Sequence, residues 1–382
     1  MDCRIQEQGG REMKEGWEYK IFESCLVKVP KQVQIKSKDY KKEGKFPIVS
    51  QEAELISGYW DDETIVYKHK EPVVIFGDHT KNIKYVDFNF VVGADGTHIL
   101  STKKDINPKF FYYVLKSIKL RELGYARHYK LLKEKYIPVP PLSEQQSIVD
   151  YLDSAFAKID AMKANAEKAL GEAKALFQAS LKEMLEPKEG WEEKKLGDIC
   201  DFRSGFAFKS NKFTKIGEPI IRISDIQNEE IDDSNLVYFD SKSYTEDLSK
   251  YLIYPDDILI AMSGGTTGKL GINTSNRTFY LNQRVGVFRE NKSYLNHRYL
   301  YHYLHTKSEE SLRIAAGAAQ PNLSTAQIKS FIIPVPSLSE QRSIVATLDS
   351  IKSKVDKLQA NYEKISQECD ALKQAILRQV FE

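Results

Sequence analysis

Two stretches of the chain share a heptad pattern of apolar residues. In residues 148–176 and again in 344–376, apolar or small side chains recur at alternating steps of four and three. A pattern that continues for about four heptads is typical of a coiled coil rather than of a single amphipathic surface helix. It predicts two helices of about 40 residues, each roughly 60 Å long at about 1.5 Å per residue. The expected seam residues are Ile148, Leu152, Ile159, Met162 and Leu176 in the first helix, and Ile344, Leu348, Ile351, Val355, Leu358, Ile365, Leu372 and Ile376 in the second.

Each predicted helix has a polar start signal. Ser143 and Ser339 follow prolines and suit the N-cap position, while Glu144 and Glu340 favour the first turn. The segments that precede the helices are typical of mixed α/β domains. Buried strands are expected at 73–76, 88–92, 257–262 and 285–288, and shorter helices are expected to begin at Asn107-Pro108 and at Asn296.

The chain contains an internal duplication. Residues 137–154 and 333–350 are identical at 14 of 18 positions, and Glu15-Gly16-Trp17-Glu18 is repeated at residues 189–192. Between these borders the second copy has 22 extra residues. Similar borders around dissimilar interiors indicate one scaffold that presents two different recognition surfaces. An alternative is ordinary drift after duplication.

Composition excludes several classes of protein. The 382 residues are enough for two or three compact domains, and the net charge of +2 excludes a polybasic tail but not a locally basic face. No apolar run approaches the roughly 20 residues of a membrane span. The four cysteines lie far apart without a CxxC pair, which argues against a zinc site or disulfide framework and fits a reducing cytoplasm.

Motifs for catalysis are weak. Residues 263–270, SGGTTGKL, lack the first glycine and the final Ser or Thr of a phosphate-binding loop. Residues 77–80, GDHT, place an acid beside an imidazole, but no further metal ligand follows at a suitable spacing, and a surface loop that touches DNA is the other interpretation. The N/D-P-P-aromatic loop and the glycine-rich cofactor turn of a DNA methyltransferase that acts on an exocyclic amine are also missing. We therefore expect no catalytic residue and no metal site in this chain.

Binding to a polyanion is the remaining function that the pattern favours. Residues 36–45 hold five lysines against two acids around Tyr40, and residues 282–284 combine Asn, Gln and Arg. Flexible cations suit phosphates, while Arg, Asn and Gln suit base edges. The predicted DNA-contacting residues are Lys36, Lys38, Lys41, Lys42, His79, Lys81, Lys84, Arg127 and Lys130 in the first copy, and Arg203, Lys209, Lys212, Arg222, Lys269, Arg277, Gln283 and Arg284 in the second.

The duplicated IPVP-P/S-LSEQ element before a heptad helix resembles the specificity subunit of type I restriction–modification systems. The repeated Gly-Trp-Glu-x-Lys opening, residues 77–97 and 203–226, the SGGTTGK stretch and residues 320–324 share this resemblance. It implies target-recognition domains at 15–140 and 189–336, spacer helices at 141–188 and 337–382, and an N-terminal extension at 1–14, within which Met13 is an alternative start.

The resemblance also implies a division of labour. Each domain would read one half of a bipartite site in double-stranded DNA, and the two helices would pair antiparallel and dock two modification subunits. Those methyltransferase subunits and the restriction subunits would supply the S-adenosylmethionine, ATP and magnesium chemistry, in the cytoplasm. Two rivals stay open at this point: a stand-alone DNA methyltransferase or nuclease, and a coiled-coil scaffold that binds only protein.

Overall fold

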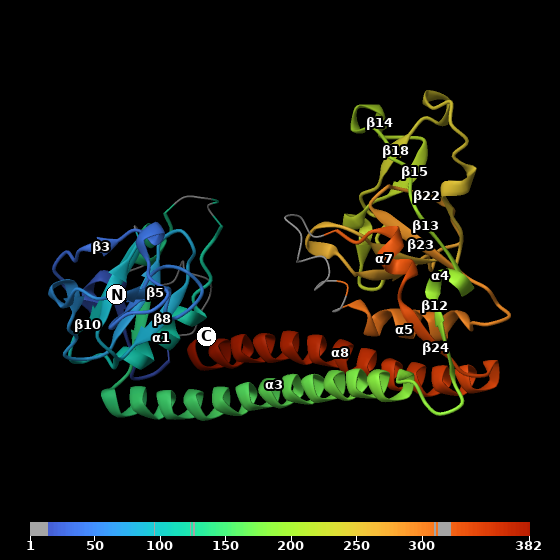
Figure 1. The fold of residues 1–382 in the computed structure, drawn as a ribbon. Coiled ribbons are helices and arrows are strands. Elements are labelled where there is room, and N and C mark those ends of the chain that lie inside the picture. Colours follow the sequence, from blue (N-terminus) through green and yellow to red (C-terminus); the bar gives the residue numbers. More distant parts are fainter. Residues whose placement is uncertain (1–13, 95, 123, 125–126, 309–310, 312–321) are drawn as a thin grey trace. The chain divides into compact units, whose positions relative to one another are not determined.

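The chain forms two compact units, each with one α/β domain and part of both long helices (Figure 1). The computed structural model describes residues 14–382 except 95, 123, 125–126, 309–310 and 312–321. The first unit consists of two segments, the residues up to Glu167 and Tyr362–Glu382. The second unit is Lys168–Asn361. The predicted fold class, duplicated α/β domains each followed by a long helix, is confirmed. Met13 and most of the predicted N-terminal extension lie outside the described residues.

The described part of the first domain consists of three small sheets and two helices. Strands β1 (Glu18–Ile21) and β11 (Tyr136–Val139) pair at its base. A four-stranded sheet has the order β2 (Leu26–Val27), β10 (Thr97–Thr102), β7 (Val73–Gly77) and β8 (Ile83–Val86). The third sheet has the order β3 (Gln34–Ile35), β9 (Phe90–Gly93), β4 (Phe46–Val49) and β5 (Gly58–Trp60), with β6 (Val66–Tyr67) also on β9. The helices are α1 (Pro108–Ser117) and α2 (Tyr129–Lys133), with 3-10 turns η1 (Phe22–Cys25), η2 (Ser37–Asp39) and η3 (Glu63–Ile65).

The second domain repeats this plan with longer sheets. Strands β12 (Glu192–Lys195) and β24 (Ile332–Val335) pair, and a six-stranded sheet has the order β13 (Cys200–Ser204), β23 (Val285–Glu290), β20 (Ile258–Ala261), β21 (Leu270–Ile272), β17 (Glu230–Ile231) and β16 (Ile226–Gln227). A five-stranded sheet has the order β14 (Phe213–Thr214), β18 (Val237–Phe239), β15 (Glu218–Ile221), β22 (Phe279–Leu281) and β19 (Leu252–Ile253). The helices are α4 (Leu196–Ile199), α5 (His297–Thr306) and α7 (Thr325–Lys329). The 3-10 turns are η4 (Ser210–Lys212), η5 (Ile223–Asp225), η6 (Ser241–Ser243), η7 (Ser249–Tyr251) and η8 (Gly264–Thr266).

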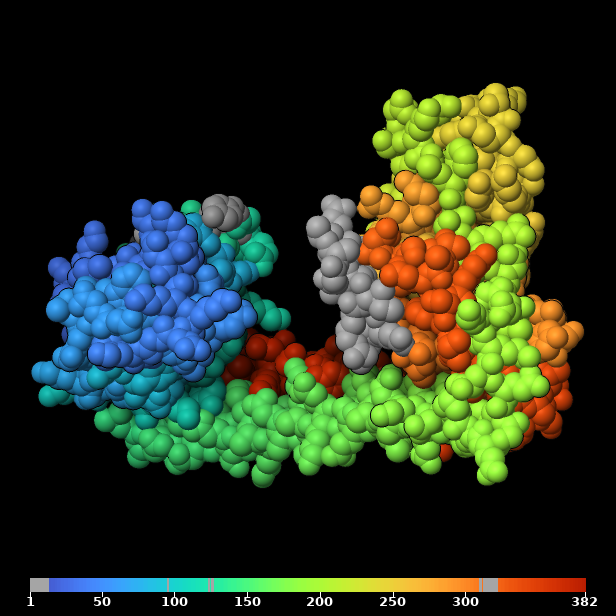
Figure 2. Space-filling model, viewed as in Figure 1, coloured from blue at the N-terminus to red at the C-terminus, as the bar shows by residue number. Residues whose placement is uncertain are grey.

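The interiors of the two domains differ in sequence but share their topology. The order β2-β10-β7-β8 corresponds to β13-β23-β20-β21, and the parallel pair β4·β9 corresponds to β15·β22. Much of the extra length in the second copy lies between the first strand of the parallel pair and the next long strand, 40 positions from β15 to β20 against 27 from β4 to β7. In the second domain this stretch forms part of the five-stranded sheet, which stands out from the part packed on the helices (Figure 2).

The duplicated sequence elements contact one another at the start of each long helix, α3 (Leu142–Leu185) and α8 (Leu338–Phe381). The fully buried amide of Gln145 accepts a hydrogen bond from the Asn107 backbone N–H at 2.8 Å and donates to the Asp105 and Pro140 carbonyls. In the second copy Gln341 makes the same three contacts, to Asn296, Tyr294 and Pro336. The repeated glutamine therefore joins the strand end, the helix start and the cap of α1 or α5.

The repeated tryptophan and glutamate also meet. The Trp17 indole Nε1 donates to Glu144 at 2.9 Å, so the Glu-Gly-Trp-Glu opening lies against the LSEQ element. The shorter helices begin as predicted, because Asn107 caps α1 and Asn296 caps α5 through their side-chain oxygens. Their apolar faces, including Phe110 and Tyr299, fill the cores beneath the sheets.

The predicted N-caps of the long helices are wrong. The Ser337 hydroxyl and Glu340 form the capping box of α8, with the Ser337 backbone N–H donating to Glu340 at 3.1 Å. Ser339 and its counterpart Ser143 lie inside the first turn instead, since the helices begin at Leu338 and Leu142. The position equivalent to Ser337 in the first copy is a proline, Pro141, which has no side chain to cap with.

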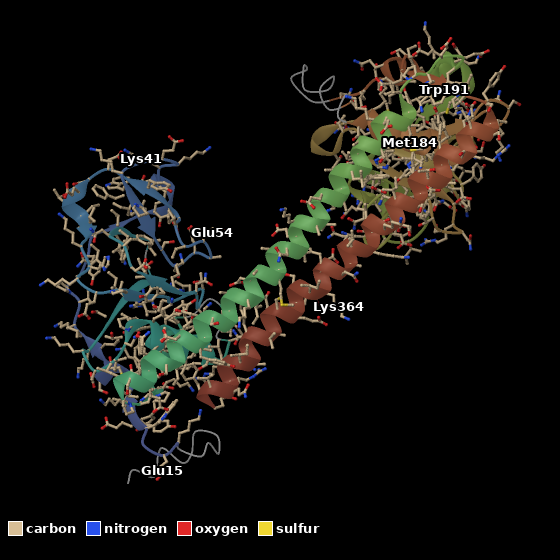
Figure 3. All side chains as sticks on the ribbon, turned by 90° about the horizontal axis from the view of Figure 1, so that it is seen from below. Glu15, Lys41, Glu54, Met184, Trp191 and Lys364 are labelled. Atoms are coloured by element: carbon tan, nitrogen blue, oxygen red, sulfur yellow. The ribbon has the colours of Figure 1, made fainter. Side chains whose placement is uncertain are left out.

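Helices α3 and α8 run antiparallel in each unit (Figures 1 and 3). In the first unit Asp160 contacts Lys373 at 2.5 Å and Lys163 contacts Asp370 at 3.8 Å. In the second unit Lys174 donates to Gln359 at 2.8 Å. Residue numbers thus rise on one helix as they fall on the other. Lys364, labelled in Figure 3, lies on the outer surface of α8.

The predicted heptad spacing is present, but half of the seam is displaced by one residue. Buried and half-buried positions in α3 include 159, 163, 166, 170, 173 and 177, and those in α8 include 355, 359, 362, 366, 369 and 373. Lys163, Gln359 and Lys373 thus lie in the seam, because their long stems pack while their polar ends reach outward. Of the predicted seam residues, Leu152, Ile159, Ile344, Leu348 and Val355 are buried, and Ile148, Ile351, Ile365 and Ile376 are half-buried. Four are exposed: Met162, Leu176, Leu358 and Leu372.

Candidate nucleic-acid interface

Three loops meet at the same place in each domain. These are the turn after β7 or β20, the link before β10 or β23, and the segment before α2 or α7. In the first domain the Asp78 backbone N–H donates to the Gly96 carbonyl, and the Asp78 carbonyl accepts from His128 N–H, both at 2.8 Å. In the second domain Met262 N–H donates to the Arg284 carbonyl, and the Met262 carbonyl accepts from Leu323 N–H. One backbone frame therefore holds different side chains in the two copies.

Asp78 organises this frame in the first domain. Its carboxylate, whose side chain is 4% exposed, accepts from the Tyr129 backbone N–H at 2.8 Å and lies 3.3 Å from His98 Nε2. Arg127 Nε is 3.9 Å away, and its side chain is 78% exposed. The GDHT stretch therefore holds a buried acid beneath the largely exposed Arg127, while Thr80 is exposed and His79 and Lys81 are half-buried. Lys81 forms an ion pair with Glu122.

The corresponding frame in the second domain borders a cavity of about 770 Å³. Gln283 and Arg284 line it together with Ser204, Ser263 and Asn322. The Ser263 hydroxyl oxygen is buried and has no hydrogen-bond partner among the described residues. A polar cavity with one cation and several amide and hydroxyl groups suits a base edge or a phosphate. Part of the predicted run 320–324 borders it, while residues 320 and 321 lie outside the described residues.

A close backbone approach positions Gln283 and Arg284. Gly205 lies against the link between β22 and β23, where an added Cβ would come within 2.0 Å of the Leu281 carbonyl oxygen. Any other residue at Gly205 would push this link away. The SGGTTGK stretch is the turn between β20 and β21 and is followed by a strand, so it lacks the helix N-terminus of a phosphate-binding loop. Lys269 is exposed at its end.

The two basic segments predicted from the sequence occupy equivalent places. Residues 36–44 and residues 209–217, which include Lys209 and Lys212 of the predicted group, both contain a 3-10 turn, η2 or η4. The chain after the turn pairs with β5 or β18, which is the neighbour of β4 or β15. Lys36, Lys38, Lys41 and Lys42 are exposed, as is Lys209. Figure 3 shows Lys41 at the part of the first domain far from α3. Lys212 lies 4.2 Å from the centre of the Tyr244 ring and is half-buried.

Several of the cations predicted to contact DNA form hydrogen bonds or ion pairs with other residues of this chain. Lys84 is only 6% exposed and donates to the Glu54 carbonyl, so the prediction that it contacts DNA is wrong for this conformation. Arg222 is held by the buried Asp225 through two hydrogen bonds of 3.0 and 3.1 Å. Arg203 pairs with Asp201, Arg277 with Asp233 and Lys41 with Asp61 at the surface. Exposed pairs of this kind are weak and can exchange for phosphate contacts. Lys130 is exposed.

Sequence reasoning missed the polar groups that shape the frame. Ser263 and Asn322 lie in the stretches 263–270 and 320–324 that the sequence analysis named, but no role was predicted for either side chain. Gln51, whose side chain accepts from the His79 backbone N–H at 3.1 Å, was not singled out. The roles of all three depend on loops that meet only in the fold. The buried Gln145 and Gln341 were detectable, because the glutamine is identical in both copies of the LSEQ element.

The two long helices carry a second repeated surface. Met162 and Leu372 in the first unit are 60% and 48% exposed, and Leu176 and Leu358 in the second are 62% and 38% exposed. Each of these residues directly precedes a seam position, so both members of a pair flank the same side of the seam. The antiparallel register places Met162 level with Leu372, and Leu176 level with Leu358. The 196-residue repeat offset relates one pair to the other.

The described residues gather no candidate metal centre. They contain no group of three or more His, Cys, Asp or Glu side chains that could hold a metal ion. Burial raises the pKa of Cys25 to about 11 and that of Cys200 to about 12, so both thiols stay protonated and inert at neutral pH. Among the helices of the described residues, none has the length and apolarity needed to cross a bilayer.

Comparison with known proteins gives a consistent picture. The chain matches the family described as type I restriction modification DNA specificity domain over residues 15–170 and again over 188–367. It is 27% identical over 340 residues to the type I restriction enzyme EcoR124I/EcoR124II specificity subunit of Escherichia coli, covering 84% of this chain and 82% of that protein. It is 27% identical over 254 residues to the type I restriction enzyme MjaVIII specificity subunit of Methanocaldococcus jannaschii, covering 62% and 60%.

Two solved structures share the fold. A chain from a structure of the type I R-M system superposes with a TM-score of 0.72 at 20% identity, covering 97% of this chain and 99% of that one. The HsdS subunit from Thermoanaerobacter tengcongensis superposes with a TM-score of 0.53 at 21% identity, covering 98% of both chains.

Proposed function

Because the chain belongs to the family of type I restriction–modification DNA specificity domains, we propose that each of its two domains reads one half of a bipartite DNA site. The chain is a specificity subunit with two target-recognition domains. The observation that supports two separate half-sites is the duplicated loop frame, which holds Arg127 and His79 in one copy and Gln283 and Arg284 in the other. Because the two loop frames share their backbone arrangement but carry different side chains, the two domains would read different base sequences.

Phosphate contacts in this proposal come from the equivalent basic segments. Residues 36–44 and 209–217 carry exposed lysines and lie in the same part of each domain. Lysines on such loops would fix the register on the duplex, whereas forked side chains in the cavity would read base edges. Arg284 suits the O6 and N7 atoms of guanine, and Gln283 suits the N6 and N7 atoms of adenine.

The chemistry belongs to partner subunits in this proposal. The relatives are specificity subunits, and the family is a DNA specificity domain. Modification subunits would bring S-adenosylmethionine for adenine methylation, and restriction subunits would bring ATP and magnesium for cleavage, so that the assembled complex acts as a site-specific deoxyribonuclease and methyltransferase. This chain's own residues bind and orient DNA. The complex would act in the cytoplasm. That compartment holds the chromosome and keeps thiols such as the free cysteines of this chain reduced.

Two modification subunits would dock on the helix pair. The pairs Met162–Leu372 and Leu176–Leu358 provide two apolar surfaces related by the internal repeat. An exposed apolar side chain on a charged helix suits the core of a protein interface rather than DNA. Two like surfaces suit two copies of one partner.

Mapping of methylated bases in the source genome tests the proposed function. Deleting the gene for this chain should abolish methylation at one bipartite motif and leave other methylated motifs unchanged. The purified chain, free of partner subunits, should neither methylate nor cut DNA. Persistence of every methylated motif after the deletion would contradict the proposal, and so would methyl transfer by the isolated chain.

A further inference from the structure

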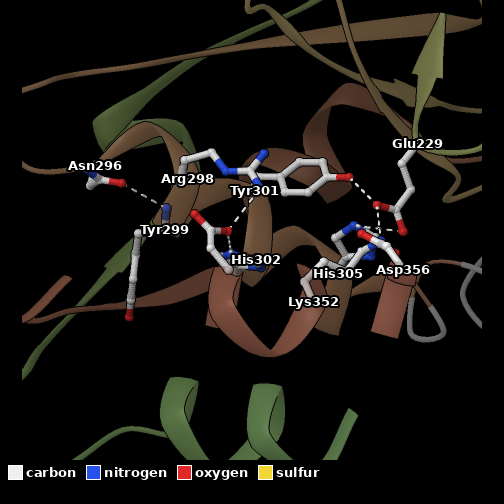
Figure 4. A network of polar contacts seen from close by, with 10 residues as sticks. Glu229, Asn296, Arg298, Tyr299, Tyr301, His302, His305, Lys352 and Asp356 are labelled. Atoms are coloured by element: carbon white, nitrogen blue, oxygen red, sulfur yellow. Dashed lines mark hydrogen bonds and ion pairs between the residues drawn. The ribbon is translucent and has the colours of Figure 1, made fainter. Parts of the chain in front are cut away.

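A polar network joins the second domain to helix α8 (Figure 4). Asp349 of α8 accepts hydrogen bonds from Arg298 at 3.0 Å and from His302 Nε2 at 2.8 Å, both on α5. One turn further along α8, the Lys352 ammonium lies 3.3 Å from Glu229 and 2.7 Å from Asp356. Glu229 also accepts from the Tyr301 hydroxyl at 2.9 Å. The network thus spans the domain's helix, its sheet and the spacer helix.

Glu229 reaches this network from the edge of the six-stranded sheet. It lies in the tight turn between β16 and β17, where Asn228 has a φ of 51° and Glu229 a φ of 65°. This left-handed backbone costs free energy for residues other than glycine. The Glu229 side chain is 38% exposed and the Lys352 side chain is 24% exposed. Both charges of this ion pair are therefore partly desolvated. The turn is therefore held against α8 by one carboxylate with three neighbours, Tyr301, His305 and Lys352.

The first domain has only part of this arrangement among the described residues. Asp153, which corresponds to Asp349, accepts from Lys109 at 2.7 Å and from the Tyr113 hydroxyl at 2.5 Å, both on α1. The carboxylate on the long helix is thus kept in both copies while its donors change. The sheet that contains β7 and β8 ends at β8, so it has no strands in the place of β17 and β16. The contact through Glu229 is specific to the second domain.

We propose that Glu229 is a positioning residue that fixes the second recognition domain on α8 and thereby restricts the gap between the two half-sites that the subunit accepts. The inference rests on the proposed function, since it assumes that each domain reads one half-site. Without the Glu229 contact, Asp349, Gln341 and the shared core still hold the domain on α8, but the β16–β17 edge of the sheet loses its tie to that helix. A domain held less firmly at this edge meets its half-site over a wider range of gaps. The bases that it reads stay the same, because the loop frame is untouched.

The test uses the complex reconstituted with its modification subunits. Its substrates are duplexes in which both half-sites are kept and the gap is shortened or lengthened by one or two base pairs. Glu229→Gln should lower the preference for the native gap over the neighbouring gaps by about fivefold, the scale of losing one hydrogen-bonded, partly exposed ion pair. Glu230→Gln, the same change at the adjacent exposed residue, is the matched control and should leave the gap profile unchanged.

A charge exchange separates positioning from general stability. Glu229→Lys and Lys352→Glu should each broaden the gap profile. The double variant should narrow it again in part, because the ion pair is restored with reversed sign while Asp356 repels the new carboxylate at 352. A change in thermal stability alone would not follow this pattern. An unchanged profile in Glu229→Gln, with a sharp profile for the unmodified complex, would overturn this inference only. An unmodified complex that methylates all gaps equally would instead refute the bipartite reading on which it rests.

Discussion

Single residues at the proposed DNA-facing edge divide into those that build the loops and those that point outward. Asp78 is buried and is bonded to backbone groups of two other segments, whereas Arg127 beside it is largely exposed. Ser263 and Arg284 show the same contrast in the second domain. Changes in the first kind should disturb a whole domain, and changes in the second kind should alter binding alone.

Arg284 and the lysines of the first domain should therefore give different defects. Arg284→Ala should cost about 1–3 kcal/mol at one base position and relax that half-site, as expected for a lost forked contact. Lys36→Glu with Lys41→Glu and Lys42→Glu should weaken binding to all sequences and flatten its salt dependence. Binding of the assembled complex to a panel of single-base site variants at several salt concentrations distinguishes them. Equal losses on every variant for Arg284→Ala would show that Arg284 does not read a base.

Stability should decrease in mild acid because of a histidine at the domain–helix junction. Burial lowers the pKa of His302 from 6.5, and protonation would add a hydrogen to its buried Nδ1, which has no hydrogen-bond partner among the described residues. The unfolded chain then binds the proton more tightly, so the free energy of unfolding falls as the pH drops from 6.5 through the lower folded pKa. Hydrogen bonds from Arg298 and His302 outweigh the desolvation of Asp349 and lower its pKa below 3.8, outside this window.

Urea unfolding at about pH 7.5 and about pH 5.5 measures this effect. His302→Gln keeps an amide donor for Asp349 but cannot be protonated, so its loss of stability between the two pH values should be smaller than that of the unmodified chain. His305, whose pKa burial also lowers, stays in place in both proteins. Identical losses in the two proteins would mean that His302 does not contribute.

Elements were predictable where local sequence determines them. The strands around 73–76 and 285–288 and the helices capped by Asn107 and Asn296 follow from apolar runs and from one capping side chain each. The apolar pattern did not predict which residues of the two long helices face each other in the seam. Apolar pattern alone selects Met162 and Leu372, but the seam takes Lys163 and Lys373, whose charged ends pair across it. A seam filled by lysine stems is invisible to hydrophobic periodicity.

The displaced seam leaves apolar pairs that should bind the modification subunits. Met162→Glu with Leu372→Glu should weaken one docked subunit by about 2 kcal/mol or more, because charge at an interface core is desolvated without a partner. Leu176→Glu with Leu358→Glu should do the same for the other, and all four changes should remove both. Native mass spectrometry of the assembled complex counts the bound subunits.

Ala161→Glu with Ala371→Glu is the matched control for this experiment. These residues are exposed next to Met162 and Leu372 but lie further round the helices from the seam. They add the same charge without touching the pair, so both subunits should stay bound. Full occupancy in the four-residue variant would assign docking to another surface.

At the scale of the whole molecule, duplication explains why the borders of the two halves are alike and their interiors are not. Gln145 and Gln341 each tie one domain to its helix by three hydrogen bonds, so a substitution of either glutamine would break this junction. The side chains of the recognition loops are not tied to the helices in this way. For that reason the equivalence of segments 36–44 and 209–217 was not apparent from sequence, where insertions shift the repeat offset and few residues are identical. The shared frame became visible only through strand pairing.

The length of the spacer helix should set the distance between half-sites. One heptad inserted after Ala166 keeps the phase of α3 and adds roughly 10 Å. Since a base pair rises about 3.4 Å per strand step, the accepted gap should lengthen by at most about three base pairs. The bases of both half-sites should stay the same, because neither domain is altered. Mapping of methylated sites for the variant assembled with its partners gives both quantities.

A second variant removes the strain that a single insertion creates. The contacts of Lys163 with Asp370 and of Asp160 with Lys373 place Ala166 level with Gln367 on α8. A heptad added at Ala166 alone forces α8 to slip or overhang, whereas one added at both levels keeps every seam contact. The double insertion should therefore give the full lengthening, with sharper selection than the single one. Altered half-site bases with an unchanged gap in both variants would show that the helices do not measure the distance, since the only change made was to their length.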